Sequence, residues 1–135
     1  MEVSVRLERE IAALDDLFAT VERFVADERL DEKTGLELAV VLEELFTNAV
    51  QHNPGGSGDL RITLRRDSGE IVLTLTDPDT DPFDLASEPP PDLFLPLAHR
   101  RPGGLGVHLV RSFVDRIECD WREREGTITL IKTLG

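Results

Sequence analysis

The segment EELFTNAVQHN, residues 43–53, places a carboxylate and an amide side chain one helical turn apart. Glu44 and Asn48 are spaced i, i+4, so they are neighbours on the surface of a helix. An Asn amide oxygen is a neutral, hard ligand for Mg2+, which takes the rest of its shell from water and nucleotide phosphates. A Glu one turn earlier could accept a proton from an attacking hydroxyl group or water. The pair indicates phosphoryl transfer, and the alternative is a solvated helix face with a weak side-chain hydrogen bond.

A glycine-rich segment, RRPGGLGVHLVR at residues 100–111, is the candidate phosphate cradle that such chemistry requires. Glycine lets the backbone approach a ligand closely, and free N–H groups at a helix start attract anions. The segment lacks the GK[ST] of a P-loop, and its glycines do not directly follow a strand as in the dinucleotide fingerprint. The alternative is a glycine turn that only permits entry into the following helix.

Asp77 ends an apolar strand pattern over residues 70–77. A carboxylate at a strand end can accept a hydrogen bond from an exocyclic amine such as that of adenine. The alternative for this position is an ordinary turn Asp. The three histidines, His52, His99 and His108, are scattered, and no pair has metal-ligand spacing.

The hydrophobic pattern predicts the elements that position these residues. Strand alternation and helical spacing give a strand, two helices, two strands, a long loop, a helix and two strands. The expected strands are residues 3–9, 60–66, 70–77, 116–125 and 126–134. The expected helices are residues 10–28, 33–52 and 103–115, and the long loop is residues 78–102. The loop carries seven prolines, and a loop of this length is usually functional or disordered. Antiparallel strand runs with helices on one face predict an α+β two-layer sandwich.

Composition limits the classes of function. The 135 residues fit one domain, and a single cysteine excludes both a disulfide framework and a cysteine-rich metal site. The net charge of −12 disfavours direct binding to nucleic acid or to an anionic membrane. A local backbone site can still hold phosphate. Because the apolar runs are too short to cross a membrane and no signal-peptide pattern is present, we expect a cytoplasmic protein.

The order of these features resembles the GHKL ATPase superfamily, and within it the small branch of anti-sigma-factor serine/threonine kinases. EELFTNAVQH is similar to its N box and GGLGVHLVRSFVD to its G2 box, and the resemblance covers nearly the whole chain. It implies a Bergerat nucleotide-binding fold over residues 1–135, with a mixed, mainly antiparallel sheet packed on three helices. Mg-ATP would lie between the helix layer and an ATP lid at about residues 84–102.

The resemblance also implies roles for individual residues. By motif position, Glu44 would be the catalytic base and Asn48 the Mg2+ ligand. Asp77 would bind the adenine amine, and Thr127 in GTITL is a second adenine-side candidate. The implied phosphate contacts are Arg100, Arg101, Gly103, Gly104, Leu105, Gly106 and Val107.

The chain departs from the superfamily at the G1 box, which has glycine two residues after its Asp. The sequence DPDTDPFD carries Asp79 at that place. Either Asp77 binds adenine through a distorted turn, or Asp79 replaces it. Additional carboxylates beside a nucleotide would weaken its binding by like-charge repulsion.

The expected function is an ATP-dependent serine/threonine protein kinase. The resemblance implies a STAS-type anti-sigma antagonist as substrate, a sigma factor as a second partner and a homodimer. The alternative is an anti-sigma or switch module that binds nucleotide with little or no transfer. The missing G1 glycine favours this module, whereas the Glu44 and Asn48 pair favours the kinase. A free ATPase is a third candidate, less favoured because we expect no second domain that would use the hydrolysis.

Overall fold

The computed structural model describes residues 2–52, 56–80 and 110–134. The elements are β1 (Glu2–Leu7), the 3-10 helix η1 (Ile11–Ala13), α1 (Leu14–Asp27), α2 (Glu32–His52), β2 (Leu60–Asp67), β3 (Glu70–Asp77), β4 (Arg116–Arg122) and β5 (Glu125–Thr133). Residues 110–113 are helical. The five strands form one sheet in the order β1-β2-β3-β5-β4, antiparallel at every described pairing. The α+β prediction is confirmed.

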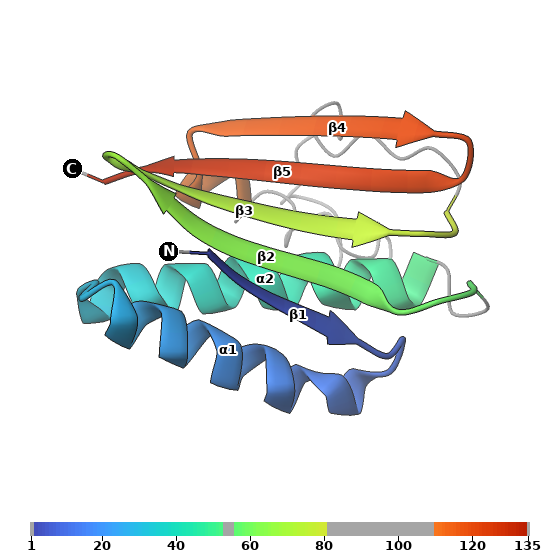
Figure 1. Cartoon of the computed structure of the whole chain (residues 1–135), viewed down its shortest axis with the longest axis horizontal. Coiled ribbons are helices and arrows are strands. Elements are labelled where there is room, and N and C mark those ends of the chain that lie inside the picture. The colour runs from blue at the N-terminus through green and yellow to red at the C-terminus, as the bar shows by residue number, and fades with distance from the viewer. Residues whose placement is uncertain (1, 53–55, 81–109, 135) are drawn as a thin grey trace, which may run out of the picture.

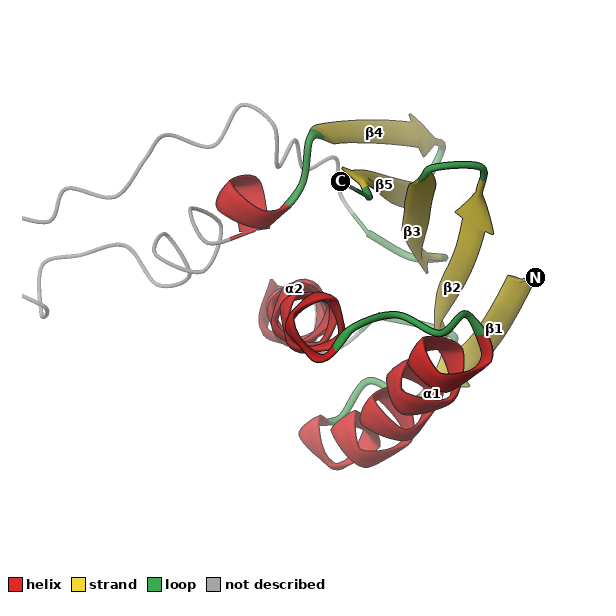
Figure 2. Cartoon of the chain, turned by 90° about the vertical axis from the view of Figure 1, so that its left-hand side faces the viewer, coloured by secondary structure: helices red, strands yellow, loops and turns green. Residues whose placement is uncertain are grey.

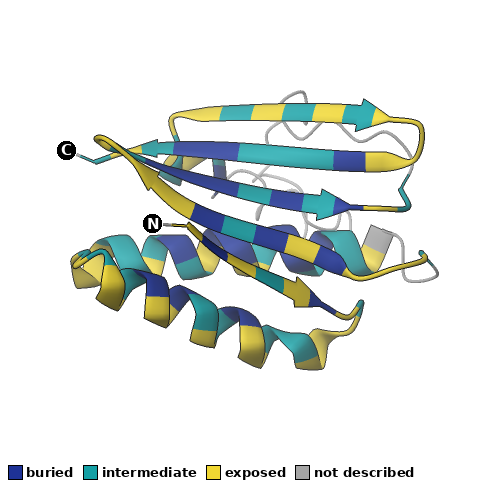
Figure 3. Ribbon diagram, in the orientation of Figure 1, coloured by how far each residue is buried: buried dark blue, intermediate teal, exposed yellow. Residues whose placement is uncertain are grey.

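The helices α1 and α2 cover one face of the sheet, as Figures 1 and 2 show. Side chains alternate along a strand, so every second residue points toward the helices. Register aligns these positions across the sheet, with Leu64 opposite Leu73 and Leu73 opposite Leu130. All three are fully buried. Figure 3 shows the same alternation as bands of buried and exposed residues along the strands.

The two long helices bury apolar stripes at helical spacing, which is why these segments fold as amphipathic helices. In α1 the buried residues are Leu17, Val21 and Phe24, and in α2 they include Leu38, Val41, Leu42, Leu45 and Phe46. Asp31 caps α2, because its Oδ1 accepts a 2.8 Å hydrogen bond from the Thr34 backbone N–H. That interaction with Thr34 holds the pKa of Asp31 below its usual value. The first helix begins later than predicted, since η1 precedes α1.

Chain connections bring four element ends to one end of the molecule. α2 ends at His52 and β2 begins at Leu60, so the start of β2 follows closely on the end of α2. The start of β2 pairs with the end of β3, where Arg61 lies opposite Thr76. The start of β5 pairs with the same end of β3. Figure 1 shows the C-terminal ends of α2 and β3 at the same side of the molecule.

Within the described ranges, no helix combines the length and apolar character needed to cross a membrane.

Candidate functional site

Glu44 and Asn48 contact each other near the end of α2. Asn48 is buried, with 9% of its surface exposed, and Glu44 is half-buried. The Asn48 side chain hydrogen-bonds the Glu44 side chain. An ionised carboxylate only accepts hydrogen bonds, so the Asn48 amide nitrogen is the donor. The Asn48 carbonyl oxygen, the atom that Mg2+ would bind, is therefore not used by Glu44.

The surroundings of Glu44 suit a proton acceptor. Burial raises the pKa of Glu44 above its ordinary value, and the negative charge of Glu43 adds to the rise. The hydrogen bond from Asn48 opposes both effects but is smaller than the effect of burial. A carboxyl group whose pKa is raised toward the operating pH is a more effective general base. The base role of Glu44 and the metal-ligand role of Asn48, which the family resemblance implies, stay predictions.

Two other polar residues on α2 have different surroundings from the Glu44 and Asn48 pair. Glu37 Oε2 lies 2.7 Å from Lys132 Nζ, so it ties α2 to β5. Both side chains are largely buried, at 15% and 17% exposure. Gln51 is exposed. These polar residues of α2 therefore differ: Glu37 is in an ion pair, Gln51 is exposed, and Glu44 and Asn48 contact each other.

Asp77 is a buried carboxylate that contacts an arginine from another part of the chain. Arg9 Nη2 lies 2.5 Å from Asp77 Oδ1, and Arg9 Nη1 donates to Oδ2 at 3.0 Å. The two side chains are 6% and 7% exposed. Sequence reasoning missed Arg9 because 68 residues separate it from Asp77. The signal that could have found it is strand order: β1 pairs with β2 and β2 with β3, so the residue following β1 reaches the end of β3.

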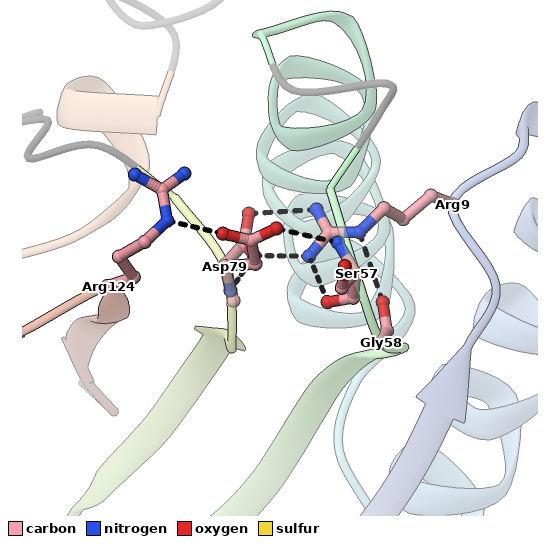
Figure 4. Close-up of polar contacts among 6 residues, drawn as sticks. Arg9, Ser57, Gly58, Asp79 and Arg124 are labelled. Atoms are coloured by element: carbon pink, nitrogen blue, oxygen red, sulfur yellow. Dashed lines mark hydrogen bonds and ion pairs between the residues drawn. The ribbon is translucent and has the colours of Figure 1, made fainter.

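Asp79 occupies the place of the absent G1 glycine, and its side chain hydrogen-bonds two other segments of the chain. Its carboxylate accepts hydrogen bonds from the Ser57 backbone N–H at 2.8 Å and from Arg124 Nε at 2.5 Å. Figure 4 shows these contacts beside those of Arg9. The bond with Arg124 is the main cause that lowers the pKa of Asp79. Asp79 thus links the segment before β2 to the turn between β4 and β5.

The backbone at Asp79 does not require glycine. Among the residues that the structure describes, the left-handed region holds non-glycine residues at Arg29, Ser68 and Glu123 only. Asp79 therefore has an ordinary φ, and a side chain causes no strain there. Aspartate in place of glycine adds a carboxylate to this turn. The backbone φ at this position does not require glycine.

Gly126 lies opposite Asp77 on β5 and supports an aromatic side chain. A Cβ atom at Gly126 would lie 2.7 Å from Trp121 Nε1 and 2.9 Å from Thr80 Cγ2, closer than carbon contacts allow. Trp121 pairs with Gly126 across β4 and β5, which places Asp77, Gly126 and Trp121 in one row on the sheet. The buried Trp121 Nε1 has no hydrogen-bond partner within the described part of the chain. The indole N–H therefore lies beside Gly126, which pairs with Asp77 on β3.

Thr127 is placed differently from Asp77. It pairs with Thr76 on β3 and with Asp120 on β4, whereas Asp77 pairs with Gly126. Because side chains alternate between the two faces of a sheet, Thr127 lies on the face opposite to that of Asp77. The register does not bring these two predicted adenine contacts together.

The predicted phosphate contacts lie outside the described residues. These are Arg100, Arg101, Gly103, Gly104, Leu105, Gly106 and Val107, together with the predicted lid at 84–102. His99 and His108 also lie there. In the described ranges, no three His, Cys, Asp or Glu side chains are grouped to hold a metal ion. A Mg2+ ion at Asn48 would accordingly depend on water and nucleotide phosphates for its other ligands.

Comparisons with known proteins agree with this fold. A solved structure of the RsbU and RsbW domains of Rv1364c from Mycobacterium tuberculosis superposes with a TM-score of 0.70 at 15% identity, over 99% of this chain and 32% of that one. A chain from the SiaB–SiaC complex of Pseudomonas aeruginosa gives 0.65 at 12% identity, over 98% and 88%. The histidine kinase AdeS of Acinetobacter baumannii gives 0.54 at 17% identity, over 98% and 68%.

A search among curated proteins gives no match. The model of the histidine kinase-like ATPase domain matches residues 7–132. Because this match spans nearly the whole chain, the protein belongs to the histidine kinase-like ATPase domain family.

Proposed function

We propose that the protein is a cytoplasmic, Mg-ATP-dependent serine/threonine kinase. Its substrate is a STAS-type anti-sigma antagonist, and it regulates a sigma factor by partner switching. The observation that carries the proposal is the contact between buried Asn48 and half-buried Glu44 in a chain of this family. Solved neighbours with an RsbW domain or in a two-protein complex support a function exercised on another protein.

In this proposal Glu44 and Asn48 on α2 have different roles. The Asn48 carbonyl oxygen would hold Mg2+, and its amide nitrogen keeps the Glu44 carboxylate in place. Glu44 accepts the proton of the incoming serine hydroxyl as the hydroxyl oxygen bonds to the γ-phosphorus and the β-γ bridge bond breaks. Bound Mg2+ would supply charge neutralisation on the phosphates, and most of the catalysis is positioning and electrostatic stabilisation.

The remaining expected contacts complete the nucleotide site in the proposal. Asp77, or Asp79 in its place, accepts a hydrogen bond from the adenine amine. The glycine segment at 103–107 and Arg101 bind the phosphates. Thr127, on the face of the sheet opposite to Asp77, is not part of the adenine site in this proposal. We also propose a homodimer, in line with the resemblance of the chain to small anti-sigma kinases.

Phosphate transfer from labelled ATP to a candidate STAS antagonist tests the proposal. The wild type is compared with Glu44→Gln, which keeps size and hydrogen bonding but cannot accept the proton. Glu43→Gln is the matched control, because Glu43 is the exposed neighbour on the same helix. We expect transfer by the wild type and by Glu43→Gln, and a loss of about 100-fold or more in Glu44→Gln with ATP binding retained. Transfer by Glu44→Gln at the wild-type rate would refute the base role.

The second candidate is a nucleotide-binding switch module with little or no transfer. The carboxylate of Asp79 at the G1 position, where the superfamily has glycine, favours this candidate. The same transfer assay distinguishes the two, since the module binds ATP but labels no antagonist.

A further inference from the structure

The hydrogen-bonding capacity of Asp77 is largely occupied within the protein itself. Arg9 binds both carboxylate oxygens, and the Asp79 backbone N–H donates a third hydrogen bond to Oδ1 at 3.0 Å. An ionised carboxylate has about four lone-pair sites. Three donors leave little capacity for a further donor from a ligand.

Arg9 is also held from its other side. Its Nε donates to the Gly58 carbonyl at 3.0 Å and its Nη2 to the Ser57 carbonyl at 3.2 Å. Figure 4 shows the Arg9 guanidinium group beside Ser57 and Gly58, with these hydrogen bonds as dashed lines. Four contacts on a side chain that is 6% exposed distinguish this pair from a surface ion pair. Arg9 is therefore a fixed part of the Asp77 environment.

We propose that Arg9 sets the base specificity of the nucleotide site by competing with the adenine amine for Asp77. This inference rests on the proposed nucleotide-binding function. With Arg9 in place, an incoming amine donor meets a carboxylate whose hydrogen bonds are already made by a guanidinium group. The preference for a 6-amino purine over a 6-oxo purine then becomes weak, because that preference depends on an acceptor at Asp77.

Removal of Arg9 should therefore strengthen ATP binding, which is the opposite of what a supporting residue would do. The gain should depend on Asp77 and should favour ATP over GTP. A hydrogen bond to a charged acceptor corresponds to roughly a tenfold or greater change in affinity. A purely structural role of Arg9 would change stability without changing the ratio of the two affinities.

The test is a titration of wild type, Arg9→Ala and Arg9→Lys with Mg-ATP and with Mg-GTP. Trp121 is the only tryptophan and lies in the same row as Asp77, so its fluorescence reports binding. Arg6→Ala is the matched control, because Arg6 is an exposed arginine on the adjacent strand β1. We expect Arg9→Ala to bind ATP at least about tenfold more tightly, with a higher ATP-to-GTP affinity ratio. Arg9→Lys should show a smaller gain, and Arg6→Ala none.

Each outcome decides the proposal. When the wild type and Arg9→Ala both also carry Asp77→Asn, the gain in ATP affinity from Arg9→Ala should vanish. A gain that persists in that background would overturn the proposal that Arg9 competes with adenine for Asp77. Unchanged ATP affinity in Arg9→Ala and Arg9→Lys, with the wild type still binding nucleotide, would overturn the role of Arg9 alone. Absence of binding of either nucleotide to every variant would overturn the proposed function as well. If Arg9→Ala does not fold, Arg9→Lys decides.

Discussion

The Asn48 amide hydrogen-bonds the Glu44 carboxylate one turn earlier on α2. The nitrogen of the amide orients the carboxylate, so Glu44 does not use the amide oxygen, which is the atom proposed to bind Mg2+. Burial of Glu44 raises its pKa at the same place. A local i, i+4 contact thus joins a candidate base and a candidate metal ligand in the second half of α2.

The raised pKa of Glu44 predicts how stability depends on pH. The folded state binds this proton more tightly than the unfolded state, so the contribution of Glu44 falls as the pH rises through the raised pKa. We expect Glu44→Gln to be at least as stable as the wild type above that pKa. The difference should shrink below the ordinary pKa of a glutamate, where Glu44 is protonated in both states. Urea denaturation across this pH range measures it, with Glu43→Gln as the charge-matched control.

A lower free energy of unfolding for Glu44→Gln than for the wild type at the alkaline end of the series would contradict this prediction. It would mean that the ionised Glu44 carboxylate stabilises the fold.

The buried ion pair of Asp77 predicts a large loss of stability on mutation. Asp77→Asn leaves the Arg9 guanidinium buried without its carboxylate, which costs about 3–5 kcal/mol. Asp67→Asn is the matched control, because Asp67 pairs with Arg65 on the surface, where the side chains are 63% and 45% exposed. That exposed pair contributes about 0–1 kcal/mol. Chemical denaturation of both variants compares the two losses, and equal losses would show that burial of the Asp77 pair carries no additional energy.

The close contact between Gly126 and Trp121 predicts that a larger residue at position 126 destabilises the fold. In Gly126→Ala the new methyl group would lie 2.7 Å from Trp121 Nε1, so the indole or the strand must shift. Overpacking of this kind costs about 1–3 kcal/mol. A Cβ atom at Gly69 meets nothing within 4 Å, which makes Gly69→Ala the control. Thermal unfolding and the emission spectrum of Trp121 should change in the first variant alone; an unchanged spectrum in Gly126→Ala would contradict the contact.

Local patterns predicted much of the fold. Strand alternation and helical spacing identified the described elements because each pattern depends on neighbours in the chain. The Asp31 cap and the Glu44 and Asn48 pair are likewise contacts within four residues. Boundaries were less accurate, as the 3-10 helix before α1 shows.

Contacts between distant segments could not be predicted from the same patterns. The pairing of Arg9 with Asp77 depends on the order and register of three strands. The ion pair of Glu37 with Lys132 depends on the packing of α2 against β5. Periodicity specifies which face of an element is apolar, but it does not specify which residue of another element lies opposite.

Asn48 allows the most direct test of the central claim, which is Mg-dependent binding of ATP at α2. Calorimetric titration with ATP, with Mg2+ and with a chelator, is performed on the wild type, Asn48→Ala and Gln51→Ala, the last being an exposed amide on the same helix. We predict tighter binding with Mg2+ for the wild type and Gln51→Ala, and loss of that Mg2+ dependence in Asn48→Ala. Equal affinities with and without Mg2+ in the wild type, or a Mg2+ dependence unchanged in Asn48→Ala, would contradict the account.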